Sequence, residues 1–183
     1  MEPIEGHTYH LGIDPGWKNL GVALVVEDKD GAFSKVKTEV INPSSYRDEA
    51  ECALDIYERY IKFTKVSSIT IERFVPFNGQ ATHEAENINL LIGAICGIIR
   101  IKEPTIQVLR VRSIEWKVAI VKALVKTRGF DNPSMSLDKK FSMAAAAACL
   151  GIIKLEKGIT DHEADSICLA SYQDIVYGKR AGR

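Results

Sequence analysis

The sequence has none of the long apolar runs that mark a membrane protein. Its longest uncharged runs, 87–99 and 141–153, have 13 residues each, fewer than the roughly 18 that suggest a membrane span. The first residues lack the apolar core of a secretory signal. No repeat, low-complexity tract or long linker rich in proline, glycine or serine interrupts the chain. We therefore expect a single globular domain over residues 1–183 without membrane association.

Cysteine is scarce, and the four cysteines lie far apart without a Cys-x-x-Cys pair. A zinc knuckle is therefore not expected, and neither is the disulfide framework of a small secreted protein. Cys96, Cys149 and Cys168 lie in apolar runs and are predicted to be small core residues. This pattern favours a reducing compartment, which we expect to be the cytoplasm, or a host cytoplasm if the gene is carried by a phage. An organelle is the alternative.

The chain also lacks a net charge, because 24 basic residues balance 24 acidic ones. The charges are nevertheless unevenly distributed. Between residues 100 and 154 there are 11 basic and four acidic side chains. Such an asymmetry is a weak indication of a polyanionic partner.

The hydrophobic pattern predicts an α/β fold. Three successive strands joined by short turns predict an antiparallel meander, and the later alternation of helix and strand predicts parallel additions to the same sheet. We expect a mixed five-stranded sheet flanked by helices. The strands are predicted at 9–14, 20–26, 33–41, 68–72 and 105–111, and the helices at 46–64, 79–100, 113–127, 137–150 and 160–177.

Local signals mark several boundaries of these elements. Residues 28–31 are typical of a hairpin turn. Ser113 is a candidate N-cap, and Gly129 is a candidate end for the same helix. Thr160 and Glu163 have the spacing of a capping box at the start of the last helix.

The first candidate for chemistry is Asp14, within Gly12-Ile13-Asp14-Pro15-Gly16. The carboxylate ends an apolar strand and precedes a forced turn, so it would be held rigidly at the end of the sheet. Taken alone, an Asp-Pro-Gly sequence more often has only a turn-forming role.

Two further acidic signals follow. Glu72 closes the strand 68–72, where an exposed pairing with Arg73 is the simpler explanation. Asp161, His162 and Asp165 have the i, i+3 and i, i+4 spacing that lets all three face the same way on a helix. Asp161 also complements the helix dipole at that position. Asp165 borders an apolar run, which makes a purely structural role harder to explain.

Together these residues give a pattern that resembles the RuvC-type Holliday junction resolvases of the ribonuclease H-like superfamily. The matching residues are the 12–16 motif, Glu72 in Ile-Glu-Arg-Phe, and His162-x-x-Asp165-Ser-Ile-Cys-Leu-Ala. Order and spacing agree over about residues 9–177, and the segment 112–117 resembles a stretch of phage and other divergent members. The resemblance implies a ribonuclease H-like fold and a structure-selective endonuclease that resolves four-way DNA junctions by symmetric paired nicking.

The resemblance also implies a catalytic, metal-binding set of Asp14, Glu72, His162 and Asp165 with two Mg²⁺ ions, for which Mn²⁺ would substitute. Two such ions can stabilise the attacking and leaving oxygens of a phosphodiester hydrolysis. In the family's scheme Asp14 bridges the ions, and Glu72 and Asp165 each complete a shell. Many members carry Asp where His162 stands and others carry His, so the fourth ligand is either His162 or Asp161.

Basic and aromatic side chains are candidates for contacts with junction DNA. Phosphate contacts would fix position without reading sequence, although a solvated charged face is the alternative for each lysine. In the family, the segment after Glu72 carries an aromatic that stacks on junction bases, and a core role is the alternative here. The candidates are Lys117, Lys122, Lys126, Arg128, Lys139, Lys140, Phe74 and Phe77.

The predicted helix 79–100 has apolar residues beyond a single stripe, including Leu90, Ala94 and Ile98. A helix that is apolar on two sides is either fully buried or part of a subunit contact. The resemblance implies a homodimer through this helix, whose two-fold axis would match a symmetrically nicked junction.

Other classes of protein share some of these sequence features. An ATP-dependent phosphotransferase of the actin, heat-shock and sugar-kinase type also opens with a strand, Asp-x-Gly and a hairpin, but it needs two such domains and a second phosphate loop. A non-enzymatic DNA-binding relative would have lost the acids. A different ribonuclease H-like nuclease, acting on RNA–DNA hybrid or branched DNA, shares the site chemistry and stays open.

Overall fold

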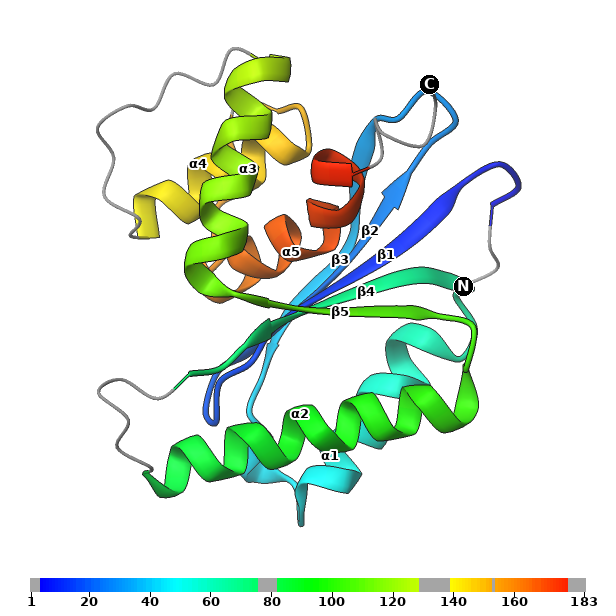
Figure 1. The fold of residues 1–183 in the computed structure, drawn as a ribbon, viewed down its shortest axis with the longest axis vertical. Coiled ribbons are helices and arrows are strands. Elements are labelled where there is room, and N and C mark those ends of the chain that lie inside the picture. The colour runs from blue at the N-terminus through cyan, green and yellow to red at the C-terminus, as the bar shows by residue number, and fades with distance from the viewer. Residues whose placement is uncertain (1–3, 76–81, 129–138, 153, 178–183) are drawn as a thin grey trace.

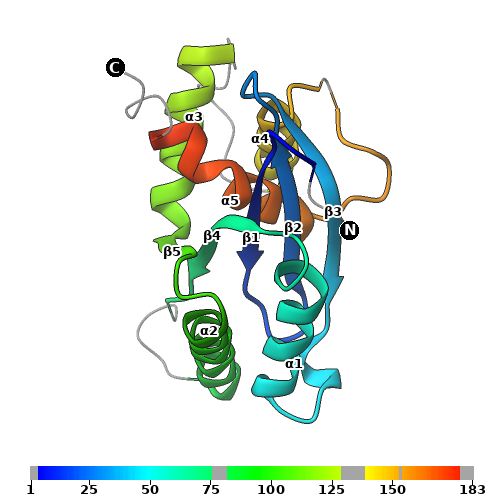
Figure 2. The same cartoon turned by 90° about the vertical axis from the view of Figure 1, so that its right-hand side faces the viewer.

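The computed structural model describes residues 4–75, 82–128, 139–152 and 154–177. They form three layers, in which a five-stranded sheet separates two groups of helices (Figure 1). Helices α1 (Glu49–Ile56) and α2 (His83–Lys102) cover one face of the sheet. Helices α3 (Ser113–Arg128), α4 (Lys139–Cys149) and α5 (Asp161–Tyr177) cover the other face, as the rotated view also shows (Figure 2).

The sheet has the order β3-β2-β1-β4-β5, with β1 at its centre. Strands β1 (Thr8–Asp14), β2 (Leu20–Glu27) and β3 (Phe33–Ile41) form an antiparallel meander. Strands β4 (Val66–Arg73) and β5 (Gln107–Arg112) extend the sheet in parallel beyond β1. The predicted mixed sheet, with its meander and its parallel additions, is confirmed.

Local chemistry explains the first hairpin. The Asp28 carboxylate accepts the backbone N–H groups of Asp30 and Ala32 at 2.9 Å each. Gly31 follows with a φ of +78°, a conformation that favours glycine. The turn predicted at 28–31 is therefore present.

The starts of α1 and α2 differ from the predicted ones because Asp48 and Thr82 cap these helices, whereas α3 begins at Ser113 as predicted. Asp48 is the N-cap of α1 and accepts the Glu51 N–H at 2.8 Å, so α1 begins at Glu49, three residues after the predicted start. It continues into a π-helical turn, Tyr57–Ile61. Ser113 is the first residue within α3 and not its N-cap. The Glu115 carboxylate instead accepts the N–H of Arg112 at 3.0 Å. Gly129, residues 79–81 and residues 137–138 lie outside the described residues.

Each face of the sheet has its own hydrophobic core. One core lies against α1 and α2, and includes Leu11, Ile13 and Ile71 from the strands. The other lies against α3, α4 and α5, and includes Ala23, Val25 and Val111. Cys149 and Cys168 are buried in this second core, as predicted, whereas Cys96 is half-buried against the first. No helix of the described residues combines the length and hydropathy of a membrane span.

Candidate active site

The ends of β1 and β4 place two carboxylates side by side. Asp14 is the last residue of β1, and Glu72 is the next-to-last residue of β4. The two strands are parallel neighbours, with Ile13 opposite Ile71, so both acids reach the same edge of the sheet. Asp14 is only 9% exposed, so its carboxylate is largely shielded from water.

Two glycines allow α5 to lie directly against this edge. A Cβ atom on Gly12 would lie 1.9 Å from the Ser166 carbonyl oxygen, and one on Gly21 would lie 2.3 Å from the His162 carbonyl oxygen. Real Cβ contacts are not this short, so any other residue would push the helix away. The close approach brings His162 and Asp165 over the carboxylates of the two strands.

The start of α5 is fixed by the predicted capping box. The hydroxyl of Thr160 accepts the N–H of Glu163 at 3.2 Å, and the Glu163 carboxylate accepts the N–H of Thr160 at 2.9 Å. Glu163 also accepts a hydrogen bond from Thr38 of β3 at 2.9 Å, which ties this turn to the sheet. The capping box therefore also fixes the position of His162 and Asp165 along the sheet.

Asp14 is paired with His162. The Nδ1 of the imidazole lies 2.8 Å from Oδ2 of Asp14, and this hydrogen bond raises the pKa of His162 above its usual value. Asp161 begins α5, and its negative charge raises the same pKa further. The hydrogen bond to Asp14 is thus made by His162.

Glu72 is paired with Trp116, which is completely buried. The indole Nε1 donates a hydrogen bond to Oε2 of Glu72 at 2.6 Å. Burial, aided by the negative charge of Asp14, nevertheless raises the pKa of Glu72 to about 7. At neutral pH this carboxyl group is therefore close to half protonated in the absence of a cation.

Asp165 is paired with Lys117 and has one oxygen that is not satisfied. The ammonium of Lys117 lies 3.4 Å from Oδ2 of Asp165, and Ser142 contributes a hydrogen bond. Oδ1 of Asp165 is buried without a hydrogen-bond partner, and burial raises the pKa of this carboxyl group. A buried acceptor without a partner is costly, and a cation at this place would satisfy it.

The chemistry of the set fits a divalent cation. Burial and the negative charge of Asp14 raise the pKa of both Glu72 and Asp165, and Mg²⁺ prefers such hard oxygen ligands. The three carboxylates do not all point at one place, because each is paired with a separate donor: Asp14 with His162, Glu72 with Trp116 and Asp165 with Lys117. Within the described part of the chain, the one group of three ligand atoms all within 4.8 Å of one another lies elsewhere, at His10, Glu27 and Asp174.

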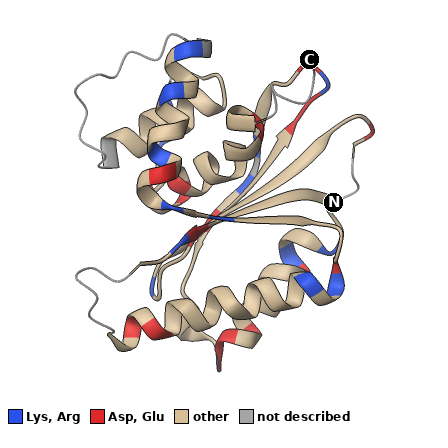
Figure 3. Cartoon of the chain, viewed as in Figure 1, with Lys and Arg blue, Asp and Glu red and all other residues tan. Residues whose placement is uncertain are grey.

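The candidate DNA-binding residues are distributed over several places. Lys122 and Lys126 are exposed on α3, along which basic residues recur (Figure 3), whereas Lys117 lies within the site. Phe74 is half-buried and packs against the core under α1 and α2. Phe77 lies outside the described residues, and the side chains of Arg128, Lys139 and Lys140 do so too.

The sequence did not identify the donors that accompany the acids. Trp116 and Lys117 hold Glu72 and Asp165, and Ser142 of α4 adds a third donor. The only signal was the segment 112–117, which contains the adjacent Trp and Lys. The spacing along the chain could not show that α3 returns across the end of β4.

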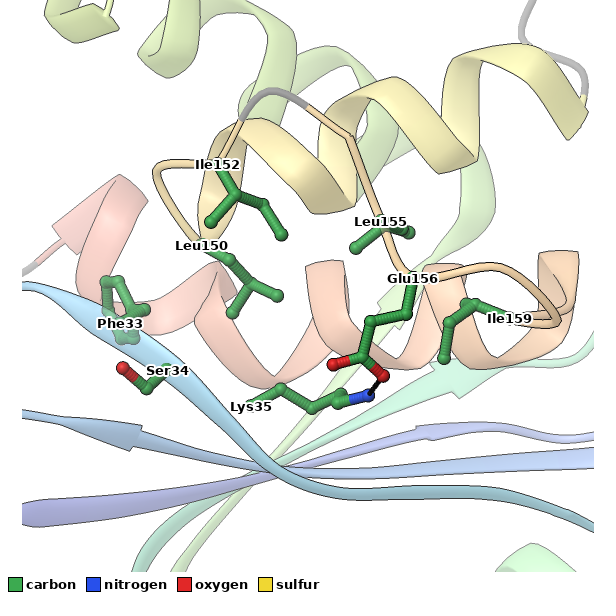
Figure 4. A pocket seen from close by; sticks show the side chains of 8 residues that line it. All are labelled: Phe33, Ser34, Lys35, Leu150, Ile152, Leu155, Glu156 and Ile159. Carbon is green, nitrogen blue, oxygen red and sulfur yellow. Dashed lines mark hydrogen bonds and ion pairs between the residues drawn. The ribbon is translucent and has the colours of Figure 1, made fainter.

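A separate pocket of about 200 Å³ lies between β3 and the segment 150–159 (Figure 4). An ion pair of 2.6 Å between Lys35 and Glu156 spans it. Its other lining residues are mainly apolar, and none belongs to the predicted site. The pocket is therefore not the place where the acids meet.

Three solved structures of Holliday junction resolvases are similar to this chain in fold. A Thermus thermophilus RuvC structure has a TM-score of 0.62 at 17% identity, and the match covers 93% of this chain and 95% of that one. The same organism's RuvC with a Holliday junction substrate gives 0.61 at 16% identity, with 94% and 95% covered. The yeast mitochondrial Holliday junction resolvase gives 0.59 at 14%, with 93% and 82% covered.

No family model and no curated protein sequence matches this chain. At identities of 14–17% the structural similarity concerns the fold. It confirms the predicted ribonuclease H-like architecture, a mixed sheet flanked by helices as in RuvC.

Proposed function

We propose that this protein is a structure-selective endonuclease that cuts four-way DNA junctions by paired, metal-dependent nicks. One observation carries the proposal. Three acids and a histidine from β1, β4 and α5 converge at one edge of the sheet, in a fold shared with RuvC. Buried ionisable groups with shifted pKa values, such as Glu72, Asp165 and His162, are typical of functional sites.

Asp14, Glu72, His162 and Asp165 would hold the divalent ions, with Mg²⁺ as the expected metal and Mn²⁺ as a substitute. Two bound ions would stabilise charge on the attacking and leaving oxygens of the phosphodiester. The protein's own contribution is to keep these ligands in place. Gly12 and Gly21 seat α5, and Trp116 and Lys117 orient two of the acids.

Affinity for the junction would come from other side chains. Exposed lysines on α3, including Lys122 and Lys126, would contact phosphates, and the segment that contains Phe74 and Phe77 would contact bases. These contacts are independent of the acids. Removal of an acid should therefore abolish cleavage without abolishing junction binding.

We propose in addition that two copies associate through α2. Leu90 is 54% exposed and Ile101 is 79% exposed on this helix. Gly93 and Gly97 lie on the same open side, with nothing within 4 Å of an added Cβ atom. This apolar face, with room for a second backbone, would relate two active sites by a two-fold axis, as a junction requires.

The test of the activity is cleavage of a synthetic four-way junction with Mg²⁺, compared with duplex, flap and RNA–DNA hybrid of the same sequence. We expect paired nicks in the junction and little cleavage of duplex. Asp14→Asn should be inactive and should still retard the junction in a gel. Preferred cleavage of the hybrid would replace the proposal with another ribonuclease H-like nuclease. Cleavage by Asp14→Asn at the wild-type rate would remove the proposed site.

A further inference from the structure

A second cluster of ionisable side chains lies at the opposite end of β1 and α5. It consists of His10 from β1, Glu27 from the end of β2 and Asp174 from α5, with one ligand atom of each within 4.8 Å of the others. His10 precedes Asp14 by four strand residues, or about 13 Å. The proposed nuclease chemistry does not use this cluster.

His10 is 2% exposed, and its two ring nitrogens face different groups. Nδ1 lies 2.8 Å from the hydroxyl of Ser68 and 3.1 Å from Oδ2 of Asp174. Nε2 lies 3.5 Å from Oε2 of Glu27 and has no hydrogen-bond partner. Oδ2 of Asp174 is also buried without one.

With both carboxyl groups ionised, a neutral imidazole cannot satisfy this arrangement in either tautomer. If Nδ1 carries the proton, the lone pair of Nε2 faces the Glu27 carboxylate. If Nε2 carries it, the lone pair of Nδ1 faces the Asp174 carboxylate. In both cases two acceptors face each other at a distance where a positive charge is needed between them.

We propose that His10, Glu27 and Asp174 bind a divalent first-row transition-metal ion such as Zn²⁺. One imidazole nitrogen and two carboxylate oxygens form a donor set for such an ion. The 3.5 Å between Nε2 and the Glu27 oxygen is close to the separation of about 3.3 Å between two ligands of a tetrahedral zinc ion. Nε2, which has no hydrogen-bond partner, is the ligand atom, and the Asp174 carboxylate, which lies 3.1 Å from Nδ1, would turn toward the ion.

The surroundings of the cluster support a metal ion. Ser68 fixes the orientation of the ring from Nδ1, as the outer partner of a ligating histidine does. The side chains of Glu27 and Asp174 are 24% and 27% exposed, which leaves a route for the ion and a place for a water ligand. Phe33 packs edge-on against the ring, and burial lowers the pKa of His10, which disfavours a proton as the missing charge.

The ion would have a structural role. It would join β1 and β2 to the far half of α5, the helix whose near half carries His162 and Asp165. The metal would therefore hold α5 on the sheet without touching the substrate. This site is independent of the proposed function and would exist even if the protein were not a nuclease.

The experiment measures Zn²⁺ binding by calorimetry to chelator-treated protein in excess Mg²⁺, together with the thermal midpoint. The host is the double variant Asp14→Asn, Asp165→Asn, in which the candidate nuclease site has lost two of its four proposed ligands. We expect one Zn²⁺ per chain and a higher thermal midpoint with Zn²⁺. Glu27→Gln and Asp174→Asn should each weaken binding by about tenfold or more and remove the shift in the midpoint.

Asp30→Asn is the matched control, because it removes a negative charge from the exposed turn next to Glu27 without changing a ligand. It should bind Zn²⁺ as the host does. Co²⁺ binding to wild-type protein, followed by the visible absorption of a four-coordinate site, gives a readout without any variant. Absence of Zn²⁺ binding to the host, or binding unchanged in Glu27→Gln and Asp174→Asn, would overturn the proposal. The proposal would also be overturned if protonation of the cluster, without Zn²⁺, raised the thermal midpoint by as much as Zn²⁺ does.

Discussion

At the level of single residues, Glu72 links the candidate site to the stability of the fold. Its pKa is raised by burial from 4.5 to about 7, so the folded state favours the protonated form. The free energy of unfolding should therefore fall as the pH rises from about 4.5 to about 7. Without a bound cation, the charged Glu72 destabilises the protein at neutral pH.

Glu72→Gln should remove this cost while keeping an oxygen for Trp116. We expect a gain of about 3 kcal/mol in the free energy of unfolding at pH 8, and almost none at pH 4, where Glu72 is mostly protonated in both states. Denaturant unfolding at the two pH values, with EDTA present, measures it. Glu5→Gln, at an exposed position before β1, is the control. An equal effect at both pH values would contradict the assigned cause.

His162 and Asp161 can be separated by their effect on the pH dependence of cleavage. A ligating imidazole must be neutral, and the hydrogen bond to Asp14 raises the pKa of His162. Cleavage should therefore decrease as the pH falls through that raised pKa. His162→Ala should lose more activity than Asp161→Ala.

The substitution His162→Asp should keep much of the activity and weaken this decrease, which lies above the ordinary histidine pKa of about 6.5. The measurement is the junction cleavage rate against pH for the three variants. An inactive Asp161→Ala together with an active His162→Ala of unchanged profile would assign the fourth ligand to Asp161.

At the level of elements, the seat of α5 on β1 determines whether the site forms at all. Gly12→Ala would place a Cβ atom 1.9 Å from the Ser166 carbonyl and 2.4 Å from the Ala170 nitrogen. Both are backbone atoms, which cannot move aside without the helix. We expect a loss of about 3 kcal/mol in stability and loss of cleavage in the fraction that still folds. If Gly12→Ala unfolded like the wild-type protein and cleaved junctions at the same rate, α5 would not lie against β1 as described.

The exposed lysines of α3 should act on affinity and not on the chemical step. Lys122→Gln with Lys126→Gln should weaken junction binding for all sequences and reduce the slope of log affinity against log salt by about 2. The cleavage rate of bound junction should be unchanged. Lys29→Gln in the β2–β3 turn is the control. A slower chemical step at saturating protein would place these lysines in the catalytic machinery.

At the level of the whole molecule, the apolar face of α2 should decide the oligomeric state. Leu90→Lys should dissociate the proposed dimer, because it places a charge at the centre of the exposed stripe. Leu54→Lys, at a 45% exposed position of α1, should not. Sedimentation equilibrium at micromolar concentration distinguishes the two. A wild-type protein that sediments as a monomer would require that the two copies meet only on DNA.

The features that were predictable from the sequence are those with local causes. The strands at β1 to β3, the hairpin at Asp28 and the capping box at Thr160 each depend on residues a few positions apart. The convergence of Asp14, Glu72 and Asp165 was inferred only by resemblance to a family. Once the strand order is known, however, it follows from parallel pairing of β1 and β4.

The features that were not predictable depend on packing between distant segments. Trp116 reaches Glu72, and Lys117 reaches Asp165, only because α3 begins where β5 ends beside β4. His10 lies in an apolar run and gave no signal, since its carboxylate partners come from β2 and α5. The start of α1 was missed because Asp48, a cap residue, lies inside the predicted helix.

The seat of α5 also sets the order in which the protein can become active during synthesis. Asp14 leaves the ribosome about 150 residues before Asp165, an interval of roughly 10 to 30 s at ordinary elongation rates. Glu72 follows 58 residues after Asp14, and from then on the nascent chain carries the acids of β1 and β4 without the helix that completes the set. The proposed nuclease would therefore remain inactive until its chain is nearly finished.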